Sequence, residues 1–248
     1  MFSIFILFIE YCNSKSDIFA LMKIKPHSRK ILTRLKAFRH RKSQKIICIG
    51  KNKTGTTSIS ALLKQLGYVV APQEPAELLV HDWYKRDFRK IIDYVKNYGE
   101  AFQDIPFSLE ETYEHLDKAF PTAKFILTIR DSPEQWYQSL TKFHGLQFGK
   151  GGRLPTKDDL MNATYRYRGF AWEVNRMLHN TPEEEPYQKE RLIEAYHRYN
   201  QNVIDYFEGK DDKLLVVNLA SSDALTKILA FLNKTGELAQ MPWENKTL

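Results

Sequence analysis

A short apolar run followed at once by a glycine- and threonine-rich loop is the feature that most constrains this fold. Residues 45–50 read KIICIG, with almost no alternation of polar and apolar residues, as is typical of a strand buried on both faces of a parallel sheet. The loop GKNKTGTTS follows at 50–58, and residues 57–66 have helical spacing that Gly67 is well placed to end. We therefore expect a strand, loop and helix unit.

The rest of the chain repeats this alternation. Ser132 followed by Pro133 predicts a helix start, because a serine cap and a first-turn proline suit a helix N-terminus. Strands that alternate with helices predict an α/β fold, with a parallel central sheet flanked by helices in a P-loop-like three-layer sandwich. Further strands are expected at 68–71, 101–105, 124–129 and 214–217, and helices at 83–98, 109–120, 187–207 and 223–232.

Residues 145–186 interrupt the alternation. They contain a glycine-rich turn, GKGGR at 149–153, and a loop rich in Pro and Glu, TPEEEP at 181–186. An insertion this long between core elements usually covers a site, so we expect a helical insertion that acts as a lid. Four of its aromatic residues either line a pocket or pack within the insertion: Tyr165, Tyr167, Phe170 and Trp172.

The net charge of +7 comes from one basic segment. Residues 23–45 hold ten Lys or Arg and no acid, and removing those charges leaves −3. We therefore divide the chain into an N-terminal basic extension, 1–44, and an α/β domain, 45–248. Apolar residues recur at helical spacing in 23–42, so the arm is expected to form an amphipathic helix that either contacts an anionic membrane or acidic partner or is solvated beside the core. Nucleic-acid binding is disfavoured, because the cations cluster on the arm without interleaved aromatic residues.

The cysteine content favours a reducing, cytoplasmic location. Cys12 and Cys48 cannot form a disulfide framework. The apolar residues 2–9 are far fewer than the roughly 20 needed to span a bilayer, and no basic segment precedes them, so we expect no membrane span or signal peptide. Met22 opens the basic stretch, and we hypothesise that translation starts there.

The loop at 50–58 has the composition of an anion site, since loop and first-turn N–H groups converge between a strand and a helix. Nucleoside-triphosphate loops, G-x-x-x-x-G-K-[ST], place a lysine directly after the second glycine. Here Thr56 stands at that position and the cation is Lys53. The next strand end presents Arg130 before Asp131, so an acid to hold Mg²⁺ is not evident. These differences disfavour a triphosphate and predict chemistry that requires no metal.

The motifs resemble those of the sulfotransferase superfamily that uses 3′-phosphoadenosine 5′-phosphosulfate (PAPS). The family's loop P-K-[ST]-G-T-T is similar to NKTGTT here, with Asn52 in place of proline. Its second motif, a strand that ends in Arg and a helix that carries Ser, is similar to TIRDSPEQWYQSL. The tail segments HRYNQNVIDYF, KLLVVNL, ILAFLNK and MPWENKT are similar to bacterial members in order and spacing, so the resemblance covers residues 45–247.

The resemblance implies a role for each motif residue. Lys53 would stabilise the charge that grows on the bridging oxygen as the S–O bond breaks, and Arg130 and Ser139 would hold the 3′-phosphate. Thr54, Gly55, Thr56 and Thr57 would cradle the 5′-phosphate, followed by Ser58. The structural alternatives are an ordinary turn for the loop, a surface ion pair for Arg130 and a plain helix hydroxyl for Ser139.

The acceptor and its base are less determined. In cytosolic animal members a K-T-H-L-P segment presents a catalytic histidine, and F-Q-D-I-P here places Asp104 at the matching position. Asp104 either takes the acceptor proton or orients the following turn. The alternative bases are His81, His115, His144 and His197. The acceptor's class and the oligomeric state do not follow from the sequence, although acceptor choice is expected to lie in 145–186.

Three departures from the family pattern and two rival functions stand beside this interpretation. Ser58 replaces a tryptophan found near the adenine, the Arg-to-Ser spacing is nine rather than eight, and GKGGR lies far upstream of the family's late phosphate loop. One rival is a P-loop kinase or nucleotide hydrolase that uses ATP and Mg²⁺. The other is a non-catalytic relative that binds nucleotide as an adaptor.

Overall fold

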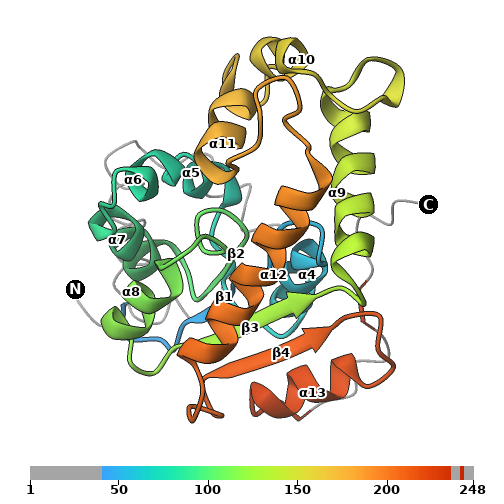
Figure 1. The fold of residues 1–248 in the computed structure, drawn as a ribbon. Coiled ribbons are helices and arrows are strands. Elements are labelled where there is room, and N and C mark those ends of the chain that lie inside the picture. The colour runs from blue at the N-terminus through green and yellow to red at the C-terminus, as the bar shows by residue number, and fades with distance from the viewer. Residues whose placement is uncertain (1–40, 236–240, 243–248) are drawn as a thin grey trace, which may run out of the picture.

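Four parallel strands form the centre of the computed structural model, which describes residues 41–235 and 241–242. The sheet order is β2 (Ala101–Gln103), β1 (Ile46–Cys48), β3 (Lys124–Ile129) and β4 (Leu214–Asn218). All three pairings are parallel, with Ile46 of β1 level with Ala101 of β2 and with Lys124 of β3. The α/β fold with a parallel sheet flanked by helices is confirmed (Figure 1).

Each face of the sheet carries its own hydrophobic cluster, because successive strand residues point to opposite faces. In β1, Ile47 joins the cluster on one face, while Ile46 and Cys48 join the cluster on the other. The first face is covered by α7 (Arg89–Tyr98), α8 (Thr112–Ala119) and α12 (Lys189–Tyr206), and the second by α4 (Thr56–Gln65) and α13 (Ala224–Phe231). The result is three layers, as expected.

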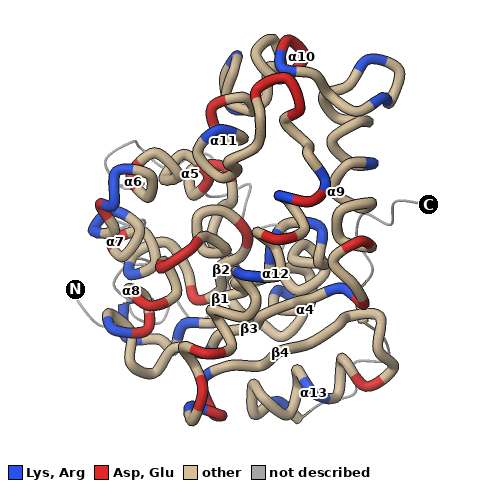
Figure 2. The backbone as a smooth tube through the Cα atoms, in the orientation of Figure 1, with Lys and Arg blue, Asp and Glu red and all other residues tan. Residues whose placement is uncertain are grey.

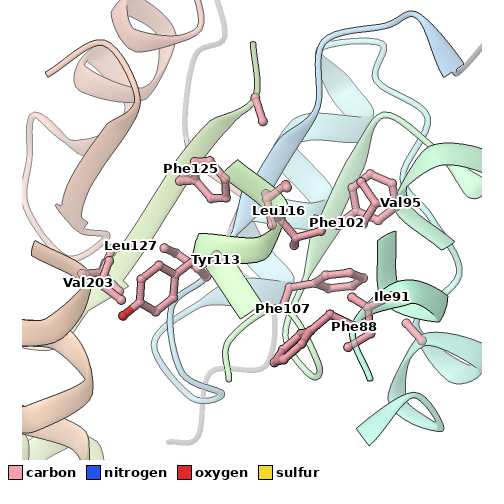
Figure 3. Close-up of a cluster of buried hydrophobic side chains, with 14 of the residues drawn as sticks. Phe88, Ile91, Val95, Phe102, Phe107, Tyr113, Leu116, Phe125, Leu127 and Val203 are labelled. Atoms are coloured by element: carbon pink, nitrogen blue, oxygen red, sulfur yellow. The ribbon is translucent and has the colours of Figure 1, made fainter. Parts of the chain in front are cut away.

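The first cluster holds most of the large aromatic side chains of the core. Figure 3 shows residues of β2, β3, α7, α8 and α12 gathered there, with Phe125 of β3 fully buried. Burial of each such side chain contributes about 1.5–3 kcal/mol. Charged residues lie on the helices and connections, while the middle of each strand is uncharged (Figure 2).

The insertion is helical and stands at the top of Figure 1. It follows α9 (Pro133–Phe148) and contains a short 3₁₀ turn (Lys150–Gly152), α10 (Lys157–Asn162) and α11 (Phe170–Leu178). The expected cap of α9 is confirmed, because the Ser132 hydroxyl accepts a hydrogen bond from the Gln135 N–H at 3.1 Å. Trp136 and Leu140 of α9 pack with Leu160 of α10 and so join the insertion to the core.

Two expected elements differ in the structure. Residues 68–71 are not a strand of the sheet: they make a single parallel bridge, Val70 to Ala101, at its edge. The helix expected at 83–98 is broken into α6 (Val80–Tyr84) and α7, and a further short helix, α5 (Gln73–Glu77), precedes them. The break has a local cause, because Arg86 adopts a left-handed φ of 61° and the Asp87 carboxylate accepts the Arg89 N–H at 3.2 Å.

The basic arm lies almost wholly outside the described residues, so its expected helix and membrane contact stay predictions. The remaining strand and helix predictions are confirmed as elements, with ends that differ by a few residues. Across 41–235, no helix is both long and apolar enough to cross a membrane.

Candidate active site

The loop after β1 and the end of β3 meet at the point where the strand order of the sheet reverses. The chain passes from β1 to β2 on one side and then returns to β3 on the other side of β1. In such sheets the connections that follow the two diverging strands open a crevice at their carboxyl ends. Here the crevice holds Lys53 and Arg130, and the Arg130 Nε donates a hydrogen bond to the Lys53 carbonyl at 2.7 Å.

The loop lies tightly against β3. A Cβ atom on Gly50 would lie 2.0 Å from the Thr128 Oγ1 and 2.6 Å from its carbonyl oxygen, so only glycine fits there. Thr54 is buried, and its hydroxyl lies 2.6 Å from the Thr128 Oγ1 and donates to the Lys51 carbonyl at 2.5 Å. The Thr54 hydroxyl therefore holds the loop in place. The backbone of the loop, rather than this hydroxyl, stays available to contact the predicted phosphate.

The loop delivers the chain into α4 through Gly55. Gly55 has φ 100° at the N-cap and no side chain caps the helix, so the first-turn N–H groups are turned toward the crevice that Gly55, Thr56 and Thr57 line. Such N–H groups, together with the positive end of the helix dipole, favour an anion. Ser58 is buried within α4 and lies outside this lining.

Three aromatic side chains, here called the aromatic brace, fix the position of the loop and of Arg130: Trp136, Tyr196 and Tyr199. The Trp136 Nε1 donates to the Asn52 carbonyl at 3.0 Å, and the fully buried Tyr199 hydroxyl donates to the Ile49 carbonyl at 2.7 Å. The Tyr196 ring stacks on Trp136 with centroids 4.4 Å apart, and its hydroxyl accepts the Arg130 N–H at 3.1 Å. The brace was not predicted, because its contacts join residues far apart in the sequence.

The ammonium group of Lys53 is partly desolvated. Its Nζ lies 3.8 Å from the centroid of the Phe143 ring of α9. Burial, followed by the Arg130 charge, lowers the pKa of Lys53, and the Asp104 carboxylate opposes this. A cation held in this way at the rim of a helix N-terminus suits the stabilisation of negative charge that develops on a leaving group.

Asp104 reaches the same crevice from the end of β2. It has a left-handed φ of 62°, and its Oδ1 accepts the Ile105 N–H at 2.9 Å, so the turn-orienting alternative is present in the structure. Asp104 also lines the crevice with Lys53. Burial, and next the Glu77 charge, raise the pKa of Asp104 to about 6, although Ile105 N–H, Lys51 and Lys53 counteract them. A carboxylate with that pKa is ionised at neutral pH and accepts a proton more readily than an ordinary Asp.

The crevice opens into a pocket of about 990 Å³ between the sheet's carboxyl edge and the helical insertion. Of the four insertion aromatics, Tyr165 and Phe170 line it. Tyr167 instead hydrogen-bonds with His81 at 2.9 Å, and Trp172 packs beneath the Arg176 guanidinium with 4.6 Å to its ring centroid.

The pattern of the whole domain matches one family. A family model described as a sulfotransferase domain matches residues 45–247. The chain belongs to the sulfotransferase family. No curated protein sequence matches it.

The histidines of this sulfotransferase domain divide by location. His144 lines the pocket, but its Nδ1 is 2.8 Å from the Tyr187 hydroxyl, and burial lowers its pKa to about 4. His81 bonds Tyr167 and His115 stacks on Phe88 at 3.8 Å, so both are engaged away from the crevice. His197 lies on a separate surface hollow. His179, which was not predicted, also lines the pocket.

Ser139 of α9 is not among the residues that line the pocket. Ser139 lies in the second turn of α9, partly buried and outside the pocket lining, so its phosphate contact stays a prediction. Among residues 41–235, no group of three or more His, Cys, Asp or Glu is placed to hold a metal ion. The expectation that the reaction requires no metal stays a prediction.

Proposed function

We propose that this sulfotransferase domain transfers a sulfuryl group from PAPS to a hydroxyl or amine acceptor by in-line displacement. The supporting observation is the hydrogen bond from Arg130 to the Lys53 carbonyl, which couples the loop after β1 to the end of β3 at the switch point. A donor with phosphates at both its 3′ and 5′ positions needs two linked anion sites of this kind. ATP carries no 3′-phosphate and gives Arg130 no such partner.

The donor's charged groups have natural partners among the loop residues. The 5′-phosphosulfate fits the N-terminus of α4, where Gly55, Thr56 and Thr57 line the crevice beside Lys53. Arg130 would hold the 3′-phosphate, with Ser139 as the predicted second contact. Charge-assisted hydrogen bonds of this type contribute about 1.5–3 kcal/mol each.

In the reaction, the acceptor oxygen forms a bond to sulfur while the bond between sulfur and the bridging oxygen breaks. The acceptor's proton passes to Asp104, and the electron pair of the broken bond stays on the 5′-phosphate of adenosine 3′,5′-bisphosphate. Lys53 stabilises that departing charge. The pKa of Asp104, raised to about 6, keeps this carboxylate ionised and basic at neutral pH.

Replacement of Lys53 by Ala tests this role. We expect turnover to fall by about 10²–10³-fold, as for other groups that stabilise a developing oxyanion, with a milder loss of donor affinity. Lys64→Ala, which removes an exposed lysine at the far end of α4, is the matched control. Unchanged turnover in Lys53→Ala would refute the assignment.

The two rivals give different results in the same assays. A kinase or nucleotide hydrolase would lose activity with a chelator and would bind ATP with Mg²⁺ in preference to adenosine 3′,5′-bisphosphate. An adaptor would bind the bisphosphate and show no turnover with any acceptor.

A further inference from the structure

The pocket contains a second lysine that the donor chemistry leaves unused. Lys51 and Lys53 leave the same loop in different directions: the Lys53 Nζ lies over Phe143 of α9, and the Lys51 Nζ lies 3.8 Å from the centroid of the Tyr199 ring of α12. Tyr199 is fully buried and fixed by its bond to the Ile49 carbonyl, so the Lys51 ammonium rests on a rigid aromatic face.

Lys51 has no carboxylate in contact. Within the described part of the chain, its Nζ makes no ion pair within 4.0 Å and no hydrogen bond, and it rests on the face of the Tyr199 ring as a cation–π contact. Burial lowers the pKa of Lys51 to about 8, with Glu110 and Asp104 acting in the opposite direction. The side chain is therefore largely charged at neutral pH. A desolvated charge without a contacting counterion is costly, and a ligand anion would remove that cost.

The surrounding wall is basic as well. The nearby acids Glu110 and Glu194 both lie beside Arg198, at 3.8 and 3.9 Å. Arg176 donates to the carbonyl and hydroxyl oxygens of Thr181, and Arg191 donates to a backbone carbonyl. We call Lys51, Arg176, Arg191 and Arg198 the basic wall; all four line the pocket. Over the whole lining of the pocket, seven Lys or Arg side chains face four Asp or Glu side chains, which leaves a positive excess.

The basic wall lines the same pocket as Asp104, the expected proton acceptor. Asp104 lines this pocket with both lysines and interacts electrostatically with each, so the expected proton acceptor lies near Lys51 as well as near the donor's Lys53. The charge of Lys51 also acts on His179, at the end of α11, whereas the charge of Lys53 acts on His144 of α9. A molecule whose hydroxyl reaches Asp104 therefore has Lys51 within the same pocket as a partner for its neighbouring atoms. Phe170 and Val174 supply apolar surface for the body of that molecule.

We propose that the acceptor of this sulfotransferase carries an acidic group, a carboxylate or a sulfate, a few atoms from the hydroxyl that is sulfated, and that Lys51 binds this group. The inference rests on the proposed function and narrows its acceptor to anionic molecules. Lys51 thus selects the acceptor, and Lys53 serves the donor.

The test uses matched probes that differ only in charge: 4-hydroxybenzoate against 4-hydroxybenzamide, and methyl glucuronide against methyl glucoside. Each is titrated by calorimetry into protein saturated with adenosine 3′,5′-bisphosphate. In at least one pair the acid should bind about 10–100-fold more tightly than its neutral counterpart, the range for a charge-assisted contact. Lys51→Met, which keeps the side-chain length, should abolish this preference, and Lys51→Arg should restore most of it.

The controls distinguish a failure of this inference from a failure of the proposed function. Lys64→Met, the same change at an exposed site, should keep the preference, and adenosine 3′,5′-bisphosphate should bind equally to every variant. The inference is overturned if no acid binds, if the preference survives in Lys51→Met, or if that variant loses affinity for the nucleotide. If the wild-type protein takes up no nucleotide, the proposed function fails, and the same titrations on nucleotide-free protein still decide the role of Lys51.

Discussion

The carboxyl group of Asp104 should titrate about two pH units above an ordinary aspartate. Burial, followed by the Glu77 charge, raises its pKa from 3.8 to about 6. At pH 5 roughly one tenth of Asp104 should then be ionised, whereas an unshifted aspartate would be over nine tenths ionised. Because a general base works only when ionised, turnover should fall about ten-fold between pH 7 and pH 5.

The two charged neighbours of Asp104 should move this pKa in opposite directions. Glu77→Gln removes a negative charge and frees the Arg166 guanidinium, whose Nε lies 2.6 Å from Glu77, so the carboxylate of Asp104 becomes easier to form and its pKa should fall. Lys51→Met removes a positive charge, so the pKa should rise.

Carbon-13 NMR of labelled aspartate carboxyl groups measures these pKa values without an acceptor, and Asp104→Asn assigns the signal. Once an acceptor is found, Asp104→Asn should lower turnover by about 10²–10⁴-fold and remove the acid limb of the pH profile. A signal that titrates below pH 4.5, or that neither neighbouring variant moves, would refute the electrostatic account. An unaltered pH profile in Asp104→Asn would point to another base.

Three further substitutions test how the loop is held. Gly50→Ala drives a Cβ into the Thr128 backbone and should cost about 1–3 kcal/mol in urea unfolding, with loss of nucleotide binding. Gly67→Ala is strained by its left-handed φ of 86° but meets no atom within 4 Å, so it should lose stability and still bind nucleotide; equal binding by both variants would contradict the packing argument. Trp136→Phe removes the donor to the Asn52 carbonyl, so it should lower the free energy of unfolding by about 0.5–1.5 kcal/mol and weaken nucleotide affinity. Wild-type affinity in calorimetry would argue against the role of the aromatic brace. Tyr199→Phe leaves a buried carbonyl unpaired and should cost about 1–3 kcal/mol, so an unchanged urea midpoint would be the contrary result.

The layered fold was predictable because its strands are buried on both faces. The run KFILTI, for example, forms β3 at its expected bounds, 124–129, since a continuous apolar run of that length suits a covered parallel strand. The two wrong secondary-structure predictions fall where local backbone geometry overrides the hydrophobic pattern. Residues 83–98 look helical throughout, yet the left-handed Arg86 and the Asp87 cap divide them. Residues 68–71 have the composition of a strand but reach only one bridge at the sheet edge.

The site was predictable only where residues lie together in the sequence. The loop from Gly50 to Thr57 carries a local signal, and the end of β3 carries another, so the sequence predicts Lys53 and Arg130 as site residues, and the structure brings the two together. The aromatic brace joins positions 84 and 150 residues apart, and no spacing rule reveals such contacts. Lys51 sits beside the motif, but its direction depends on where α12 places the Tyr199 ring.

Binding of adenosine 3′,5′-bisphosphate tests the central claim most directly. Calorimetry in the presence of EDTA should show one site that prefers this nucleotide over adenosine 5′-monophosphate by about 10–100-fold, the contribution expected of a 3′-phosphate held by a guanidinium. Arg130→Ala should erase the preference while the protein stays folded. Heat that appears only with ATP and Mg²⁺, and none with the bisphosphate, would contradict the account.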